Sequence, residues 1–338
     1  GKKNLKMKNL DKKESGRRPY RAVLLLMLFA VSSCSIKQMA YKSAVNAMAP
    51  LPEQKIKIKI DPNAPNPVTA LTGEDDIELV GAVFPIILKL YEAMYIQNPK
   101  HRGLAVMTGQ LYIMYSNVFV ETPAAYLSDN EFDKKNTAFF RAKKFYLRGA
   151  KAALSALDTA YPGFAAAVFS GDAKKAAAFT AQCKVYDAEA LHWAGAGFLA
   201  AFALDPLDSD SMQMVPGAVL MLERVCTLNP EYAEGTVWEI LTKFYASAPE
   251  YLGGSEQKAE AAYQKALELS HGKRPSVYVT YAQSFCIPKQ DGKAFDKAIE
   301  QALSIDPEAD YANKLTVTLA QNYAKWLKKH KNDFILTR

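Results

Sequence analysis

The sequence lacks the residue patterns that most catalytic and metal sites need. No H-E-x-x-H or other metal-binding spacing is formed by its four histidines, which are His101, His192, His271 and His330. There is no G-x-S-x-G segment and no phosphate-binding loop that ends in Gly-Lys-Ser or Gly-Lys-Thr. We therefore expect that the chain is not an enzyme and that it holds no metal ion and no dissociable cofactor.

Two partial motifs do not change this expectation. Gly195–Ala200 fits G-x-G-x-x-A, but a dinucleotide site needs a strand just before the glycines, and the preceding residues are helical in character. Asp205, Asp208 and Asp210 bring carboxylates together, but the closing Glu of a calcium loop is missing. We interpret the first as close helix packing and the second as a solvated loop.

Cysteine is also scarce. Three cysteines follow Cys34, at Cys183, Cys226 and Cys286. Their odd number and wide spacing fit neither a disulfide framework nor a zinc site. Because each lies among apolar residues, we expect buried thiols that pack as small hydrophobic groups.

Basic residues are in excess only at the N-terminus. The formal charge of the chain is +7, but residues 1–33 carry nine Lys or Arg against Asp11 and Glu14, and the rest of the chain is balanced, with 33 basic and 33 acidic residues. A nucleic-acid-binding surface would need basic residues in the folded body. We therefore expect no nucleic acid partner.

The N-terminus has the order of a secretion signal. A basic region precedes the apolar run Ala22–Val31, which is too short to anchor stably across a bilayer. Val31-Ser32-Ser33-Cys34 resembles a bacterial lipobox, which implies that residues 1–33 are a signal peptide and that Cys34 carries a covalent lipid. The alternative is an ordinary secretory signal with a chance cysteine.

Residues 34–73 are predicted to be a tether between the lipid and the body. They contain the alternating segment Lys55–Ile60 and five prolines, which disfavour a helix; the prolines are Pro50, Pro52, Pro62, Pro65 and Pro67. The rest, residues 74–338, is predicted to be a single α-helical repeat domain. We expect a buried apolar helix over 77–97, another over 103–120 and a long amphipathic one over 131–161, and we expect no run of strands after Ile60.

Within this domain, Trp238–Ala266 carries the clearest sign of a repeat. Large residues fall at W-x2-L-x3-Y spacing in its first half, and small residues alternate with Tyr263 at A-x3-Y-x2-A spacing in its second half. Such halves are typical of a tetratricopeptide-type helical hairpin. Weaker copies pair Trp193 with Ala218, Tyr278 with Phe295 and, most faintly, Gly109 with Ala142. The fold class is therefore all-α, with stacked antiparallel hairpins of divergent tetratricopeptide-like repeats; the alternative is an irregular helical bundle.

Stacks of this kind bind partners on a concave surface lined by the first helix of each hairpin. The hairpin register predicts inward-facing, partner-binding or ligand-binding residues at Gln110, Phe198, Glu239, Lys243 and Gln283. The alternative for each of them is an ordinary surface or inter-repeat contact.

The chain resembles the TatT family, the T component of tripartite ATP-independent periplasmic (TRAP) transporters. Val31–Cys34, the segment Leu228–Gly254 (LNPEYAEGTVWEILTKFYASAPEYLGG) and the segment Leu303–Asp310 (LSIDPEAD) carry the resemblance. It implies a periplasm-facing lipoprotein, anchored in the membrane by its lipid, that binds the solute-binding subunit of the transporter. It also implies a homo-oligomer and a small hydrophobic ligand. The membrane leaflet stays open.

Two other functions stay open at this stage. The first is a tetratricopeptide scaffold lipoprotein for cell-envelope assembly. The second is an enzyme built from scattered residues, for which Asp187, Glu189 and His192 are the candidates, although Asp187 and His192 are badly spaced to face each other on one helix.

Overall fold

A computed structural model describes residues 41–55 and 68–336. The predicted signal peptide, the predicted lipidation site Cys34 and most of the Lys55–Ile60 alternation lie outside the described residues. The chain divides into two units, residues 1–49 and residues 50–338. The described part of the first unit is a helix over 41–48, which ends where the amide of Ala49 donates to the carbonyl of Val45 at 2.8 Å.

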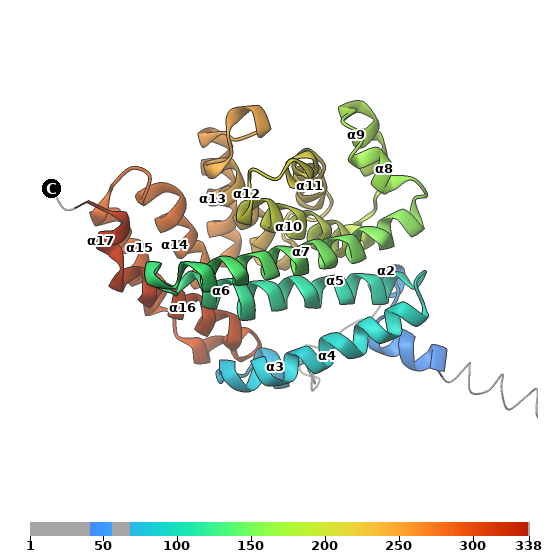
Figure 1. Ribbon diagram of the computed structural model, residues 1–338, viewed down its shortest axis with the longest axis horizontal. Helices are drawn as coiled ribbons and strands as arrows, with labels where there is room; N and C mark the ends of the chain where they lie inside the picture. Colours follow the sequence, from blue (N-terminus) through green and yellow to red (C-terminus); the bar gives the residue numbers. More distant parts are fainter. Residues whose placement is uncertain (1–40, 56–67, 337–338) are drawn as a thin grey trace, which may run out of the picture. The chain divides into compact units, whose positions relative to one another are not determined.

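The second unit is built from helices and turns, and no strand occurs in residues 50–55 and 68–336, which confirms the predicted all-α class (Figure 1). Its longer helices are α4 (Ile77–Gln97), α5 (Arg102–Ser116), α7 (Phe132–Ala160), α9 (Ala173–Gln182), α10 (Ala188–Leu204), α11 (Ser209–Leu228), α12 (Thr236–Ser247), α13 (Glu256–Ser270), α15 (Gly292–Ser304) and α16 (Lys314–Lys329).

Shorter helical segments join or extend them. They are α2 (Pro52–Lys55), α3 (Thr69–Thr72), α6 (Thr122–Ala125), α8 (Phe164–Val168), α14 (Pro275–Tyr281), α17 (Lys331–Phe334), the π-helical η1 (Asn117–Glu121) and η6 (Ala282–Cys286), and the 3₁₀ turns η2 (Asp129–Glu131), η3 (Val185–Asp187), η4 (Tyr232–Gly235), η5 (Glu250–Leu252) and η7 (Pro307–Asn313).

Polar side chains fix where several helices begin. Asp76 accepts a hydrogen bond from the amide of Leu79 at 3.0 Å, so the acidic segment before α4 does start that helix as expected. Asp208 caps α11 in the same way, and α11 therefore begins at Ser209 with Pro216 inside it. Asp210 is thus helical, although the sequence predicted a solvated loop there.

The helices pack in the pairs expected from the sequence. α5 packs on α7, α10 on α11, α12 on α13 and α14 on α15. At the first of these contacts two glycines meet, because a Cβ on Gly149 would lie 2.7 Å from the carbonyl oxygen of Gly109. At the second, a Cβ on Gly195 would lie 2.8 Å from the carbonyl oxygen of Ala218, which accounts for the glycines of the G-x-G-x-x-A segment by packing.

The largest hydrophobic core lies among α5, α7, α10, α11, α12 and α13, and includes Leu157, Leu191, Met221, Leu241 and Tyr263. The three cysteines of the body are free and buried, as predicted. Burial raises the pKa of the Cys183 and Cys226 thiols to about 12.

The long helix α16, which lies near the C-terminus, returns to the start of the body. Leu315 shares a core cluster with Val80 and Phe84 of α4, and Tyr311 lies against Gly73. The ammonium of Lys314 bridges to Asp75 at 2.9 Å. The two ends of the helical body are therefore joined by contacts.

The prediction that α4 is buried is wrong. Only four of its side chains are buried, namely Val80, Phe84, Leu88 and Glu92. By length and composition alone α4 could cross a membrane, but just 22% of its most apolar window is covered in the structure. The physical reason is that a helix with apolar residues on all sides does not show in its sequence which side is covered.

The segment predicted as a tether is partly helical and partly packed. α2 and α3 both lie within residues 34–73. Arg102 of α5 forms an ion pair with Glu53 of α2, and Lys55 reaches Glu189 of α10 at 2.7 Å. The five prolines therefore do not keep the whole of this segment free of helix or free of the body.

Candidate functional site

The structure places the five predicted site residues in different surroundings. Phe198 on α10 is only 2% exposed and packs edge-on against Phe169, with ring centroids 5.1 Å apart. Gln110 on α5 keeps its amide nitrogen 3.6 Å from the sulfur of Met114, on the same helix. Glu239, Lys243 and Gln283 instead take part in a polar cluster contributed by five parts of the chain.

Two of these parts are the π-helical segments. η1 follows α5 and carries Glu121, and η6 follows α14 and carries Gln283. A π-helical turn widens the helix by one residue and redirects its side chains, and such turns are frequent at functional sites. Each of the two segments thus carries one member of the cluster, Glu121 on η1 and Gln283 on η6.

Glu121 accepts a hydrogen bond from the hydroxyl of Tyr146 on α7. Burial raises the pKa of its carboxyl, while Tyr146, the ammonium of Lys243 and Asn117 lower it by a smaller amount. Burial also places the pKa of the Tyr146 hydroxyl well above its ordinary value. The carboxyl of Glu121 is thus shielded from solvent and takes up a proton at a higher pH than an exposed carboxyl does.

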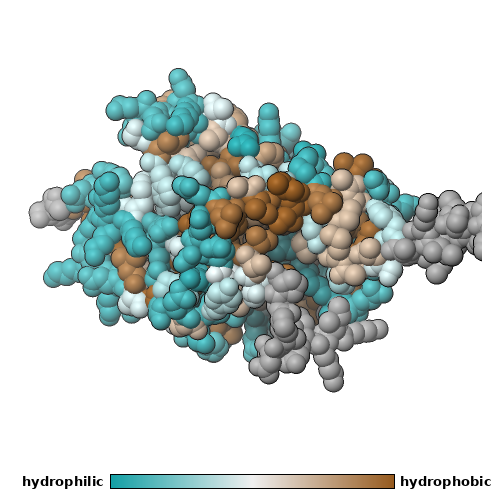
Figure 2. All heavy atoms as spheres, turned by 90° about the horizontal axis from the view of Figure 1, so that it is seen from below, coloured by the Kyte–Doolittle hydropathy of each residue, from teal (hydrophilic) through white to brown (hydrophobic). Residues whose placement is uncertain are grey.

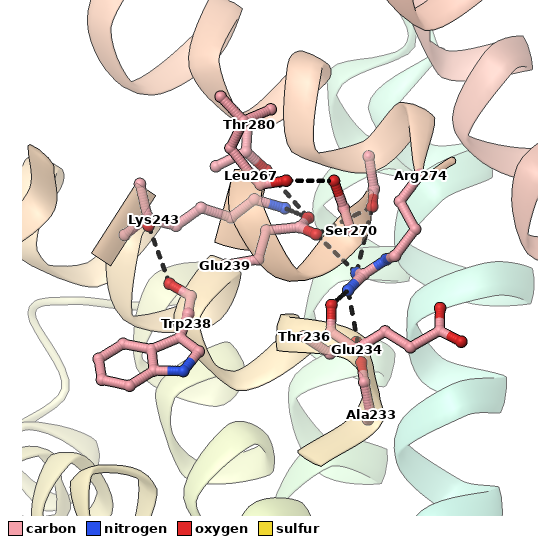
Figure 3. A network of polar contacts seen from close by, with 12 residues as sticks. Ala233, Glu234, Thr236, Trp238, Glu239, Lys243, Leu267, Ser270, Arg274 and Thr280 are labelled. Carbon is pink, nitrogen blue, oxygen red and sulfur yellow. Dashed lines mark hydrogen bonds and ion pairs between the residues drawn. The ribbon is translucent and has the colours of Figure 1, made fainter. Parts of the chain in front are cut away.

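Glu239 on α12 is the best-satisfied carboxylate of the cluster (Figure 3). It accepts from Arg274 at 2.7 Å, from Ser276 at 2.9 Å and from Thr280 at 3.0 Å. Burial raises the pKa of Glu239, but Lys243, Arg274 and the two hydroxyls together lower it further, so the net pKa lies below its ordinary value. Glu239 therefore stays ionised although it is 6% exposed.

Lys243 is the member of this cluster that reaches solvent. Its side chain is 52% exposed, and its ammonium lies 3.6 Å from Glu239 Oε1. The same ammonium stabilises ionised Glu121, so it stands near two carboxylates from different helices. An ammonium has three N–H donors, so Lys243 can donate to a polar group of an incoming molecule while its charge still balances the two carboxylates.

The C-terminal helix completes the cluster. The amide of Gln283 donates to the hydroxyl of Tyr323 on α16 at 2.7 Å. Burial raises the pKa of the Tyr323 hydroxyl, and the nearby Glu121 carboxyl raises it further, while the bond from Gln283 lowers it by a smaller amount than burial raises it. We call this set the inner polar cluster: Glu121, Tyr146, Glu239, Lys243, Gln283 and Tyr323.

Sequence reasoning missed half of these residues. Tyr146 lies four residues after Ala142 of the faintest repeat copy and was not selected as a site residue, and nothing about the spacing of Glu121 or Tyr323 indicated a site. The one available signal was an acidic residue, Glu121, directly after an apolar stretch. Their meeting depends on the two π-helical turns and on the return of α16, which are features of packing.

The residues of the enzyme hypothesis have separate structural partners. Asp187 is fully buried and accepts from Arg102 at 2.7 Å and from Tyr161 at 2.6 Å. Glu189 pairs with Lys55. His192 stacks on Trp193 and meets the hydroxyl of Tyr232 at 3.4 Å, and burial lowers its pKa to about 4. In residues 41–55 and 68–336, no group of three or more His, Cys, Asp or Glu is placed to hold a metal ion.

The paired helices and the polar cluster between them define an all-α protein that presents polar groups from distant parts of its chain at one place. The sequence model of the TRAP transporter T-component family (TAtT) matches residues 73–335. This chain therefore belongs to the TRAP transporter T-component family, as its resemblance suggested. A protein of Treponema pallidum (strain Nichols), described as uncharacterized, is 47% identical over 305 residues, which cover 90% of this chain and 94% of that protein.

Proposed function

We propose that this chain is a periplasm-facing lipoprotein that binds the solute-binding subunit of a TRAP transporter and assists uptake of its ligand. The observation that carries the proposal is the family match, which covers the helical body from α4 to α17. The family is one of transporter components, and this agrees with the prediction that the chain acts by binding.

The inner polar cluster is the proposed contact point for the partner or its ligand. Its carboxylates are satisfied within the chain, whereas the ammonium of Lys243 is half exposed. A partner that offers a carboxylate or a carbonyl oxygen could accept a hydrogen bond from the ammonium of Lys243, whose neighbours are held by hydrogen bonds within the chain. Fixed surroundings lower the ordering cost of binding.

Attachment to the membrane through a lipid on Cys34 is the second part of the proposal. It rests on the lipobox-like residues Val31–Cys34, because Cys34 lies outside the described residues. The expected change on Cys34→Ser is loss of the acylated form, seen by mass spectrometry as absence of the acyl chains from the peptide that contains residue 34.

Affinity capture of the membrane-extracted full chain tests the partner. A solute-binding protein should be recovered with the wild-type chain, and Lys243→Glu should lower the recovery by tenfold or so, since about 1.4 kcal/mol corresponds to one factor of ten. Lys265→Glu is the matched control, because Lys265 on α13 is 54% exposed and likewise paired with a glutamate.

Two outcomes would contradict the proposal. Recovery of envelope-assembly factors alone would favour the scaffold function instead. An equal loss of the recovered solute-binding protein for Lys243→Glu and Lys265→Glu would show that the inner polar cluster is not where the partner binds.

A further inference from the structure

The short helix α2 fastens the start of the body to two later helices. The carboxylate of Glu53 forms an ion pair with Arg102 at the start of α5. The ammonium of Lys55 lies 2.8 Å and 2.7 Å from the two carboxylate oxygens of Glu189 on α10. Pro52 is buried, and α2 packs on η3. Two ion pairs and one buried side chain therefore hold α2 on the body.

The guanidinium of Arg102 is positioned for α2 by a buried partner. Its Nη2 donates to Asp187 at 2.7 Å, and Asp187 is fully buried and also accepts from Tyr161 at 2.6 Å. Its Nη1 is the nitrogen that meets Glu53. Because a planar guanidinium that is fixed on one side has little freedom left, a second carboxylate binds it at a lower ordering cost. Arg102 is therefore a prepared docking point.

The order of charges along α2 fixes how it can dock. The acid at residue 53 meets a base, and the base at residue 55 meets an acid. Exchange of the two residues would place a carboxylate against Glu189 and an ammonium against Arg102. Like charges in such positions repel each other. The contact is therefore specific for an acid followed two residues later by a base.

The two ion pairs are partly open to water. The side chains of Glu53 and Lys55 are 39% and 49% exposed. Ion pairs with this exposure are weak, and salt screens them. A segment that is held by few contacts can open while the rest of a protein stays folded. α2 can therefore leave its docking site without unfolding of the body.

α2 lies at one end of the body. It meets the start of α5, just after α4 ends, whereas α15 and α17 lie at the opposite end (Figure 1). It is also the first helix of the second unit, which begins at Pro50. A lipid on Cys34 would therefore hold the body by this end for as long as α2 is docked.

We infer that α2 is a clasp that keeps this end of the body close to the membrane, and this inference rests on the proposed lipid at Cys34. With the clasp closed, the chain from Cys34 to Pro52 includes the helix over 41–48 and spans at most about 50 Å.

Opening of the clasp lengthens this reach. The next described segment that packs on the body is α3, which begins at Thr69 and contacts η7 and α16. Full extension from Cys34 to Thr69 allows about 100 Å. A closed clasp thus restricts the body to partners near the membrane, and an open clasp lets it meet partners farther away.

Zero-length cross-linking of the full chain tests the closed clasp. A carbodiimide joins an ammonium to a carboxylate as an amide, with loss of water, where the two groups are in contact. Lys55 and Glu189 should be joined in this way, and mass spectrometry of the linked peptides identifies the product. Lys289 and Glu256 form the reference pair, because their charged groups also lie 2.7 Å apart. At low salt the two yields should agree within about threefold.

Energy transfer from the body to the lipid tests the reach. Lipid-carrying chains in vesicles with acceptor-labelled lipids receive a donor dye at Lys100→Cys, beside the clasp, or at Asn332→Cys on α17, since both positions are exposed. The three native cysteines of the body are buried and stay unlabelled. Transfer should be at least about twofold stronger from residue 100 than from residue 332, because a short tether limits only the near end.

Exchange of the two charges of α2 opens the clasp without changing the composition of the chain. Glu53→Lys together with Lys55→Glu should lower transfer from residue 100 about twofold, since both pairs become repulsive. Addition of Glu189→Lys should recover part of this loss, because residue 55 then meets an opposite charge again. The control exchanges the charges of the reference pair, as Glu256→Lys with Lys289→Glu, and should leave transfer unchanged.

Three results would overturn the inference. A yield of the Lys55–Glu189 link below about a tenth of the reference would show that α2 is not docked. Equal transfer from residue 100 in the parent chain and the exchanged chain would show that docking does not limit the reach. Absence of transfer from both positions in the parent chain would contradict the lipid anchor, and the reach with it, whereas the cross-link reports the docking of α2 independently of the lipid.

Discussion

The inner polar cluster and the exposed face of α4, which is made of Leu79, Val83, Ile86, Leu90 and Ala93, reverse the usual arrangement, since carboxylates are inside and apolar side chains are outside (Figure 2). Glu239 is 6% exposed, whereas Ile86 is 69% exposed. Inside, each carboxylate has partners from its own chain, so burial is tolerated. Outside, the apolar side chains have none among the described residues. The carboxylates of the first region therefore have their partners within one chain, whereas the second region keeps apolar side chains exposed.

The largest expected effect comes from removing the carboxylate of Glu239 from the inner polar cluster. Glu239→Ala leaves the guanidinium of Arg274 and two hydroxyls without their acceptor. Removal of one partner from a buried charged pair costs about 3–5 kcal/mol. Urea unfolding should show this loss. Glu268→Ala, at the exposed pair with Lys265, should cost less than about 1 kcal/mol, and equal losses would contradict the contrast.

A matched pair of truncations on α4 compares the two sides of one helix. Leu88→Ala should cost about 2–5 kcal/mol because Leu88 is 3% exposed and packs in the core. Ile86→Ala, two residues away, should stay within about 0.5 kcal/mol under dilute conditions. A large loss for Ile86→Ala in denaturant unfolding would mean that the exposed face of α4 is already covered within the single chain.

Lowering the pH tests a buried group on the inner side. Burial lowers the folded-state pKa of His192 to about 4, against an ordinary value of 6.5. The unfolded chain therefore binds a proton first, and folding stability is lost as the pH falls from about 6.5 to 4. The loss is about 3 kcal/mol at 1.36 kcal/mol for each unit of pKa. The His192→Gln variant should show a flatter acid limb, and identical pH profiles would contradict this.

The smallest expected effect concerns the helices that separate the two regions. α5 packs between α4 and α7, and Gly149→Ala would press a methyl group to 2.7 Å from the Gly109 carbonyl. Overpacking of this kind costs about 1–3 kcal/mol. Gly292→Ala is the control, because its Cβ would meet atoms no closer than 3.4 Å. A loss in thermal stability for both variants alike would count against close packing as the cause.

The sequence predicted the class, the pairing of helices and the long helix α7, because these depend on residue periodicity within each segment. The prediction that α4 is buried was wrong, since apolar residues occur on both of its sides and only tertiary contacts decide which side is covered. Register arguments selected Lys243 and Gln283, and the structure places both in the inner polar cluster, while their role in binding stays a prediction. They placed Phe198 on the same surface, yet this residue is in the core.

The inner polar cluster itself could not be predicted. Glu121, Tyr146 and Tyr323 lie on three elements that are far apart in the chain, and two π-helical turns aim the side chains of Glu121 and Gln283. Hydrophobic periodicity carries no information on such turns, because they insert one residue without changing the composition of the helix.

The contacts of Lys314 with Asp75 and of Tyr311 with Gly73 also have a thermodynamic consequence. In an open array of helical hairpins, the terminal units can fray one by one, and unfolding spreads from the ends. Here α3 and the segment before α4 contact η7 and α16, which lie near the other end of the chain, so loosening of one end removes contacts from the other. We expect the body to melt in one cooperative step, seen as a single transition in calorimetry.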